Sequence, residues 1–243
     1  MSSAAERVSN IAIAIAALTL AIVFASRELS QRNSARVANP TENALVFVPE
    51  WKEIRSVGID LESATRPVRI LVFSDLECPY CAKFHLSTLA SLSKAYPGKV
   101  ATTFVHYPIR SHRFSMQAAV ALECAAEQSV QVEFLNAVYG KQDSIGLRSW
   151  ETYARDARVS DTALFRACNS ANAKERIVAG KTWGERIELR ATPTILVNGW
   201  RFSGVPDDKE LGAAIDAILA GRDPVTSAPI ELRRTTMRSR APR

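Results

Sequence analysis

The segment PVRILVFSDLECPYC, residues 67–81, decides the fold that the sequence predicts. Its first half, residues 67–73, is a β-branched apolar run with the length of a buried strand. Beyond the segment, apolar residues continue at helical spacing to Ala90, and Pro97-Gly98 ends the predicted helix. The two cysteines of the segment therefore lie where a strand passes into a helix.

The pair Cys78 and Cys81 has a spacing that is common to zinc sites and to redox-active disulfides. A zinc site needs a second pair of ligands. The remaining candidates offer no second CxxC or HxxxH spacing: Cys124, Cys168, His85, His106 and His112. A redox pair instead belongs at a strand-to-helix junction. The sequence therefore favours a redox pair and predicts no metal and no cofactor.

The two cysteines are expected to differ in reactivity. Cys78 would occupy the helix N-terminus, where free N–H groups and the positive end of the helix dipole stabilise a thiolate. Cys81 would lie one turn further along on the same face, close enough to form a disulfide. Pro79 suits the first helical position, where an N–H would have no partner. We expect Cys78 to be the nucleophile and Cys81 the buried resolving thiol.

The predicted order of elements is βαβ, a helical block and ββα, which is an α/β arrangement. The Asn198-Gly199 pair is a strong signal for a two-residue hairpin. The last helix is expected to begin near Asp207 and Asp208. The other elements are a strand at 100–107, helices within 112–190, strands at 192–197 and 200–202, and the end of the last helix at Gly221.

Pro193 stands at the entry of a predicted strand, where a proline inside a sheet is normally excluded. A cis peptide bond between Thr192 and Pro193 would remove the conflict, whereas a trans proline would place the strand at an edge. Because this proline occurs in the same chain as the cysteine pair, we favour the cis form.

Three segments resemble the family of DsbA-like thioredoxin-fold oxidoreductases. Residues 73–81 are similar to the family's active-site segment, and residues 191–199 to its cis-proline loop and the next strand. Residues 106–108, His112 and the Ala-rich helix at 117–126 are similar to the segment after its second strand. The resemblance covers about residues 66–221.

The resemblance implies a thioredoxin fold over residues 46–222, with an all-helical insertion at 112–190. It also implies disulfide exchange with the cysteines of protein substrates outside the cytoplasm, and recycling by a membrane-bound or soluble redox partner. In the family's roles, Cys78 attacks, Cys81 resolves, and Pro193 lies in cis beside the disulfide. Thr192 would offer its backbone to the substrate chain.

Tyr80 departs from the family pattern, because strongly oxidising members typically carry histidine there. The motif Cys-Pro-Tyr-Cys also occurs in isomerase-like and reductase-like relatives. The oxidase direction is favoured, and a reductase or isomerase of the same fold remains an alternative. A second alternative is a non-enzymatic chaperone or binding module with structural cysteines.

Three other residues have open roles. Glu77 either tunes the Cys78 thiolate or is a solvated carboxylate before a helix. Cys124 and Cys168 fall on alanine-rich helical stretches. They are either two buried thiols or, as we favour for an oxidising compartment, a structural disulfide.

The N-terminal part predicts a hydrophobic helix at residues 11–25, after a short flank at 1–10. Such a helix would span about 22 Å at 1.5 Å per residue, short of a ~30 Å hydrocarbon core. It is either a membrane anchor, which we favour, or a cleaved secretory signal. With residues 26–45 as a polar linker, the domain is expected on the periplasmic side of the cell envelope.

The net charge of +6 does not indicate a nucleic-acid partner. The excess of arginine lies just after the apolar N-terminal run and recurs in residues 222–243, and the rest of the chain is slightly acidic. Residues 223–243 are predicted to be a basic disordered tail. Motifs typical of nucleic-acid binding are missing from the sequence.

Overall fold

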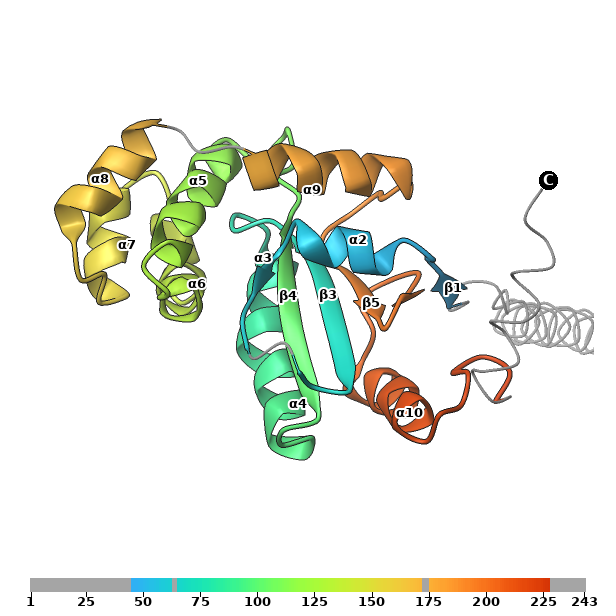
Figure 1. The fold of residues 1–243 in the computed structure, drawn as a ribbon. Coiled ribbons are helices and arrows are strands. Elements are labelled where there is room, and N and C mark those ends of the chain that lie inside the picture. Colours follow the sequence, from blue (N-terminus) through green and yellow to red (C-terminus); the bar gives the residue numbers. More distant parts are fainter. Residues whose placement is uncertain (1–44, 63–64, 172–174, 228–243) are drawn as a thin grey trace, which may run out of the picture. The chain divides into compact units, whose positions relative to one another are not determined.

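A mixed β-sheet lies at the centre of the protein in the computed structural model, which describes residues 45–62, 65–171 and 175–227 (Figure 1). The strand order is β1-β6-β5-β3-β4-β2, with β3 and β4 parallel and every other pair antiparallel. The strands are β1 Val46–Phe47, β2 Ile59–Asp60, β3 Val68–Ser74, β4 Val100–His106, β5 Thr194–Val197 and β6 Trp200–Arg201.

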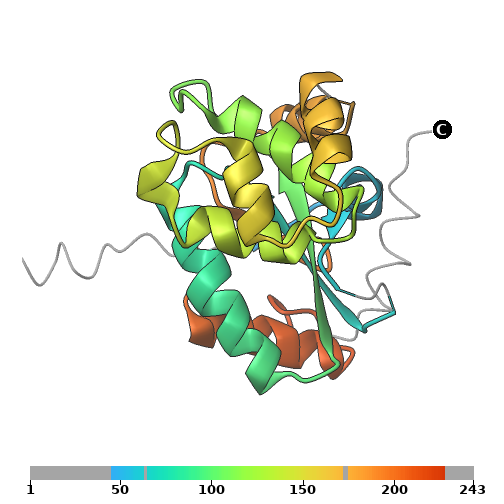
Figure 2. The same cartoon turned by 90° about the vertical axis from the view of Figure 1, so that its left-hand side faces the viewer.

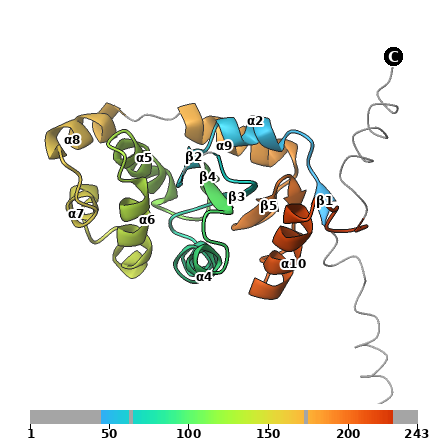
Figure 3. The ribbon, with the colours of Figure 1, turned by 60° about the horizontal axis from the view of Figure 1, so that its bottom comes forward.

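Strand β3 is buried along its whole length because helices cover both faces of the sheet. Val68, Ile70 and Val72 pack on one face against α4 (Ala90–Ala95) and α10 (Asp208–Leu219). Leu71 and Phe73 point to the other face, towards α2 (Trp51–Ser56) and α9 (Glu175–Arg186). Figure 3 shows these two pairs of helices on opposite sides of the strands. The alternation along β3 thus defines two hydrophobic layers.

The helix that comes after β3 is irregular. It begins as α3 (Pro79–Lys83), continues as a π-helical segment at Phe84–Leu89, and ends as α4. Segments of π-helix are rare and often lie at functional sites. The expected helix is therefore present, but its middle part is π-helical where the sequence predicts a regular α-helix.

A hairpin and a capping box place the C-terminal elements as the sequence predicts. Asn198 and Gly199 have φ values of 46° and 93°, the left-handed conformation that a two-residue hairpin requires. A Cβ at Gly199 would lie 2.5 Å from Trp51, so only glycine fits there. The carboxylate of Asp207 accepts the N–H groups of Lys209 and Glu210 at the start of α10.

A block of helices lies between β4 and β5 (Figure 2). Its core contains Phe134, Leu135, Tyr153 and Phe165 together with the alanines of the first helix. The helices of the block are α5 Ser115–Ala126, α6 Gln131–Tyr139, α7 Trp150–Asp156 and α8 Thr162–Ala171, with a 3-10 turn at Gln142–Ser144. After the block, α9 returns to the sheet.

Three close contacts connect the block and α9 to the sheet and to each other. Gly180 of α9 lies so close to β4 that a Cβ would be 2.5 Å from the carbonyl oxygen of His106. The buried carboxylate of Glu123 binds His106 at 2.8 Å and Arg176 at 2.8 Å. The two contacts of Glu123 join β4, α5 and α9 through one buried carboxylate.

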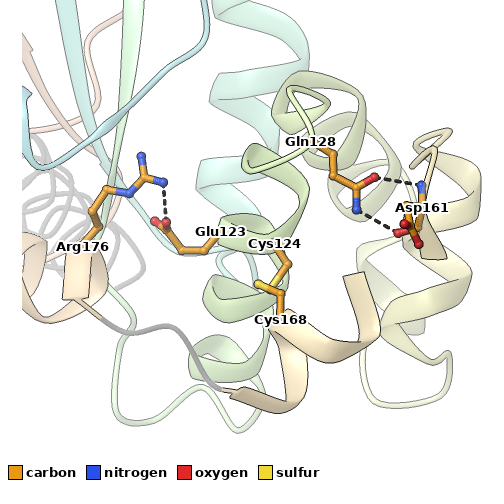
Figure 4. Close-up of a disulfide and its surroundings, with 6 residues drawn as sticks. All are labelled: Glu123, Cys124, Gln128, Asp161, Cys168 and Arg176. Carbon is orange, nitrogen blue, oxygen red and sulfur yellow. Dashed lines mark hydrogen bonds and ion pairs between the residues drawn. A yellow bond between two sulfur atoms is a disulfide. The ribbon is translucent and has the colours of Figure 1, made fainter. Parts of the chain in front are cut away.

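Cys124 and Cys168 form a disulfide between α5 and α8 (Figure 4). Their Cα atoms are 5.7 Å apart, a normal separation for a bridged pair. Figure 4 shows the Glu123–Arg176 ion pair on the opposite side of α5 from the disulfide. The contact of Gln128 with Asp161 lies beyond the end of α5, next to the start of α8. The bond joins cysteines 44 residues apart within the helical block.

The edges of the domain differ from the sequence prediction. The predicted order of elements begins at the strand of residues 67–73, whereas the structure has β1, α2 and β2 before it, because two-residue strands leave no periodic pattern. At the other end, Asp223 is buried and its carboxylate accepts the N–H groups of Val225 and Thr226. The ordered chain therefore continues through a turn beyond residue 222.

The predicted flank, hydrophobic helix and most of the linker and tail lie outside the described residues. Within the part of the chain that the structure describes, no helix is both long and apolar enough to span a bilayer.

Removal of the Cys124–Cys168 bond tests its structural role. Replacing both cysteines by alanine should lower the free energy of unfolding by about 4 kcal/mol, because the closed loop restricts the unfolded chain. Chemical denaturation of the double variant and the wild type measures the difference. Equal stability, with both thiols free in the wild-type protein by mass spectrometry, would show that the bond has no structural role.

Candidate functional site

The site lies at the end of β3, and the register of the sheet explains why distant segments meet there. Phe73 pairs with Thr194 in the antiparallel neighbour β5, so the segment before β5 lies beside the loop after β3. Ser74 pairs with His106 at the end of the parallel strand β4. The residues after β3, those after β4 and those before β5 therefore gather at one edge of the sheet.

Cys78 is the N-cap of α3, with Pro79 at the first helical position. Its protonated thiol donates to the carbonyl oxygen of Thr192 at 3.3 Å, and the Thr192–Pro193 peptide bond is cis. A hydrogen bond from Cys81 lowers the pKa of Cys78 from 9.0 to about 6, with help from the backbone N–H groups of Cys81 and Tyr80. These contacts outweigh burial, so Cys78 is mostly a thiolate at neutral pH.

Cys81 has the opposite character. Its side chain is 1% exposed, and burial raises its pKa above the ordinary value, with the neighbouring Cys78 thiolate adding to the effect. A second negative charge so close to the first is unfavourable. Both cysteines are in the thiol state in this structure. At neutral pH the pair thus favours an ionised Cys78 sulfur beside a neutral Cys81 sulfur.

Tyr80 separates the two cysteines and is strongly exposed, at 67%. A hollow beside it is lined by the segment 188–194 and by Arg201 to Val205. A second hollow on its other side reaches from Lys83 and Thr88 to the start of α10. Tyr80 and Val205 border both hollows, so open surface with apolar elements lies next to the helix turn that carries the cysteines.

The buried carboxylate of Asp75 holds the active-site loop to the segment after β4. It accepts the N–H of Glu77 at 2.8 Å, the N–H of Ile109 at 2.8 Å, and a hydrogen bond from Nδ1 of His112 at 2.8 Å. Three donors on one buried carboxylate offset the free energy that its burial costs. Asp75 therefore positions the loop that carries Cys78.

Two further side chains support the backbone of this loop. The Gln142 amide donates to the carbonyl oxygens of Leu76 at 2.7 Å and Cys78 at 3.0 Å. The carboxylate of Glu77 accepts the N–H of Phe114 at 2.7 Å. The carboxylate of Glu77 thus binds the backbone of the neighbouring loop.

The structure brings together most of the residues that the sequence singled out, namely Cys78, Pro79, Tyr80, Cys81, Thr192 and Pro193. Cys124 and Cys168 lie in the helical block, in a bond of their own. Among the described residues, no cluster of three or more histidine, cysteine or acidic side chains has the arrangement of a metal site.

Sequence reasoning missed Asp75 and Gln142. Asp75 carried a weak signal, since a carboxylate directly after a buried strand and before a loop often accepts backbone N–H groups. Gln142 carried none, because it lies in the helical block, 64 residues from the carbonyl of Cys78 that it binds.

The low pKa of Cys78 depends first on Cys81, so changing Cys81 should shift it. In Cys81→Ala the pKa of Cys78 should rise towards 9.0, whereas Cys81→Ser, which keeps a hydroxyl donor, should stay closer to about 6. The rate of iodoacetamide alkylation against pH reports this pKa, because only the thiolate reacts. An unchanged profile in Cys81→Ala, or faster alkylation of Cys81 than of Cys78 in the wild type, would contradict the assignment.

Sequence comparison identifies a matching family and related proteins. A family model described as Thioredoxin matches residues 63–217. The Na(+)/H(+) antiporter NhaA 1 of Mycolicibacterium vanbaalenii is 25% identical over 219 residues, which cover 80% of this chain and 35% of the antiporter. The chain thus spans about a third of the length of that relative, and the antiporter name belongs to the whole of it.

Solved structures with the same fold come from several bacteria. BdbD of Bacillus subtilis, in its oxidised form, has a TM-score of 0.61 at 20% identity, covering 68% of this chain and 95% of BdbD. The α-DsbA1 of Wolbachia pipientis has a TM-score of 0.56 at 22% identity, covering 67% and 91%. The DsbA of Mycobacterium tuberculosis has a TM-score of 0.53 at 21% identity, covering 67% and 92%. With the family model matching most of the described chain, the protein belongs to the thioredoxin family, and its fold is that of the DsbA-like proteins.

Proposed function

We propose that the protein is a thiol–disulfide oxidoreductase that exchanges disulfides with the cysteines of other proteins. The observation that carries this proposal is the unequal pair at the start of α3: the pKa of Cys78 is lowered to about 6, while that of the buried Cys81 is raised. Exchange needs one reactive thiolate and one protected thiol that attacks second. Solved neighbours include a protein named a thioredoxin-like oxidoreductase, from Silicibacter pomeroyi.

The open surface around Tyr80, next to Cys78, suits a polypeptide substrate. The two hollows that border Tyr80 leave room for an extended chain, and one of them is lined by Thr192 and Pro193 beside Cys78. The backbone of Thr192, whose carbonyl lies 3.3 Å from that sulfur, is placed to pair with such a chain. A protein cysteine bound there meets Cys78 before any other sulfur of the site.

The charge on Cys78 favours the oxidase direction. A stabilised thiolate exists only in the reduced protein, so it favours the reduced form and makes the disulfide a stronger oxidant. In this direction a substrate thiolate attacks Cys78 of the Cys78–Cys81 disulfide, and Cys81 leaves with the bonding electron pair. A second substrate thiolate then attacks the substrate sulfur of the mixed disulfide and releases Cys78, so that the substrate is oxidised and the pair reduced.

An extracytoplasmic location fits this chemistry. The Cys124–Cys168 bond belongs to the kind of structural disulfide that persists in oxidising compartments. The apolar run at residues 11–25 would bring the domain there, as an anchor or as a cleaved signal. A redox partner in the same compartment would then reoxidise the pair.

Incubation with a reduced, unfolded disulfide protein tests the proposed activity. The oxidised wild type should restore the activity of that substrate, Cys78→Ser should be inactive, and Cys81→Ser should accumulate a mixed disulfide through Cys78. Non-reducing electrophoresis and mass spectrometry identify the trapped species.

The double variant Cys124→Ala/Cys168→Ala serves as the matched control, because it removes the other disulfide and leaves the pair. It should oxidise the substrate at the wild-type rate at a temperature where it stays folded. If only this control lost activity and Cys78→Ser stayed fully active, the exchange chemistry would belong to Cys124 and Cys168, and the proposal would be wrong.

A further inference from the structure

A small cavity beside the active-site helix is lined in part by Cys81. Its volume is about 10 Å³, which is room for a single water molecule. Its polar lining consists of Cys81, Ser74, Thr102, Tyr139 and His85. The cavity therefore connects the buried thiol with a histidine on the same helix, one turn further along.

The thiol of Cys81 must lose its proton during exchange. Burial raises its pKa, so water does not take the proton readily at neutral pH. Cys78 cannot take it either once its sulfur is bonded to a substrate. The resolving step therefore needs another proton acceptor near Cys81.

Two of the hydroxyl groups that line the cavity, those of Ser74 and Tyr139, are paired with each other. Ser74 forms a hydrogen bond with Cys81, and its Oγ lies 2.9 Å from the hydroxyl of Tyr139. Burial raises the pKa of Tyr139 well above its ordinary value, so this hydroxyl keeps its proton and passes one on only by accepting another. The Ser74 and Tyr139 hydroxyls can therefore pass a proton from one to the other while neither of them becomes ionised.

His85 is the titratable group at the outer end of this arrangement. Its ring packs on that of Tyr139, with 5.2 Å between centroids, and its Nε2 lies 3.0 Å from Oδ1 of Asn136. Burial lowers its pKa below the ordinary 6.5, and the contact with Asn136 opposes the shift. The titratable side chains that line the cavity with it are Cys81 on its own helix and Tyr139 on α6.

We propose that His85 accepts the proton of Cys81 through the cavity and the Ser74–Tyr139 hydroxyl pair, an inference that rests on the proposed exchange activity. In the resolving step the Cys81 proton passes to the neutral imidazole, and the Cys81 sulfur attacks Cys78. The Cys78–substrate S–S bond breaks, the Cys78–Cys81 bond forms, and the substrate leaves as a thiolate. In the oxidase direction the imidazolium returns the proton to Cys81 as that sulfur leaves.

The two steps can be timed separately with a small aromatic disulfide whose thiolate is coloured. Reduced protein should release the coloured thiolate twice, first when Cys78 attacks and again when Cys81 resolves the mixed disulfide. In the wild type the second rate should rise with pH and level off once the pH exceeds the pKa of His85. Cys78 carries no proton in the mixed disulfide, so its own pKa does not affect this phase.

His85→Gln removes the proton acceptor. Its second phase at pH 7 should be slower by about a hundredfold, the lower end of what a positioned acid–base group contributes. The rate should also keep rising with hydroxide concentration instead of levelling off. Tyr139→Phe should slow the same phase, and the first phase should be unchanged in both variants.

Leu86→Gln is the matched control, because it changes an exposed neighbour on the same helix that is 42% exposed. It should behave as the wild type in both phases. The proposal would be overturned if the second phase of His85→Gln and Tyr139→Phe had the same rate as that of Leu86→Gln. The same would hold if its rate levelled off at the same pH in all three variants. A wild type that releases only the first equivalent would instead overturn the proposed exchange activity itself.

Discussion

The structure depends on a single electrostatic constraint: two thiols in the first turn of one helix cannot both be ionised. The fold assigns the charge to Cys78, which lies at the helix N-terminus and accepts a hydrogen bond from Cys81. Cys81 is enclosed by the sheet and the helical block, so burial keeps it neutral. The stability that the thiolate gives the reduced protein is complete above the ordinary pKa of 9.0 and is lost as the pH falls through about 6.

Much of the architecture around this pair could be predicted from the sequence, because its signals are local. The alternation along residues 68–74 defines both hydrophobic layers, and the Asn198-Gly199 turn pairs β5 with β6. The proline at the entry of β5 indicated a cis bond, and the register of β5 against β3 then explains how residue 192 reaches Cys78. The Cys124–Cys168 bond was one of two alternatives, since spacing alone does not determine which cysteines meet.

The parts that sequence reasoning missed are those that depend on contacts across the fold. Asp75 binds a backbone N–H and a histidine from a loop more than thirty residues away, and no period in the sequence reports that contact. The cavity beside Cys81 arises where β3, the π-helical segment and α6 meet, so its lining is visible only once they are packed. The short edge strands β1 and β2 owe their pairing to neighbours, not to their own pattern.

The reduction potential of the Cys78–Cys81 disulfide, measured in glutathione buffers, tests the central claim most directly. If the Cys78 thiolate stabilises the reduced protein, the potential should be less negative than the ~−270 mV of thioredoxin and closer to the ~−120 mV of strong oxidants. A potential at or below about −270 mV would contradict the account, because the charge on Cys78 would then not favour the reduced form.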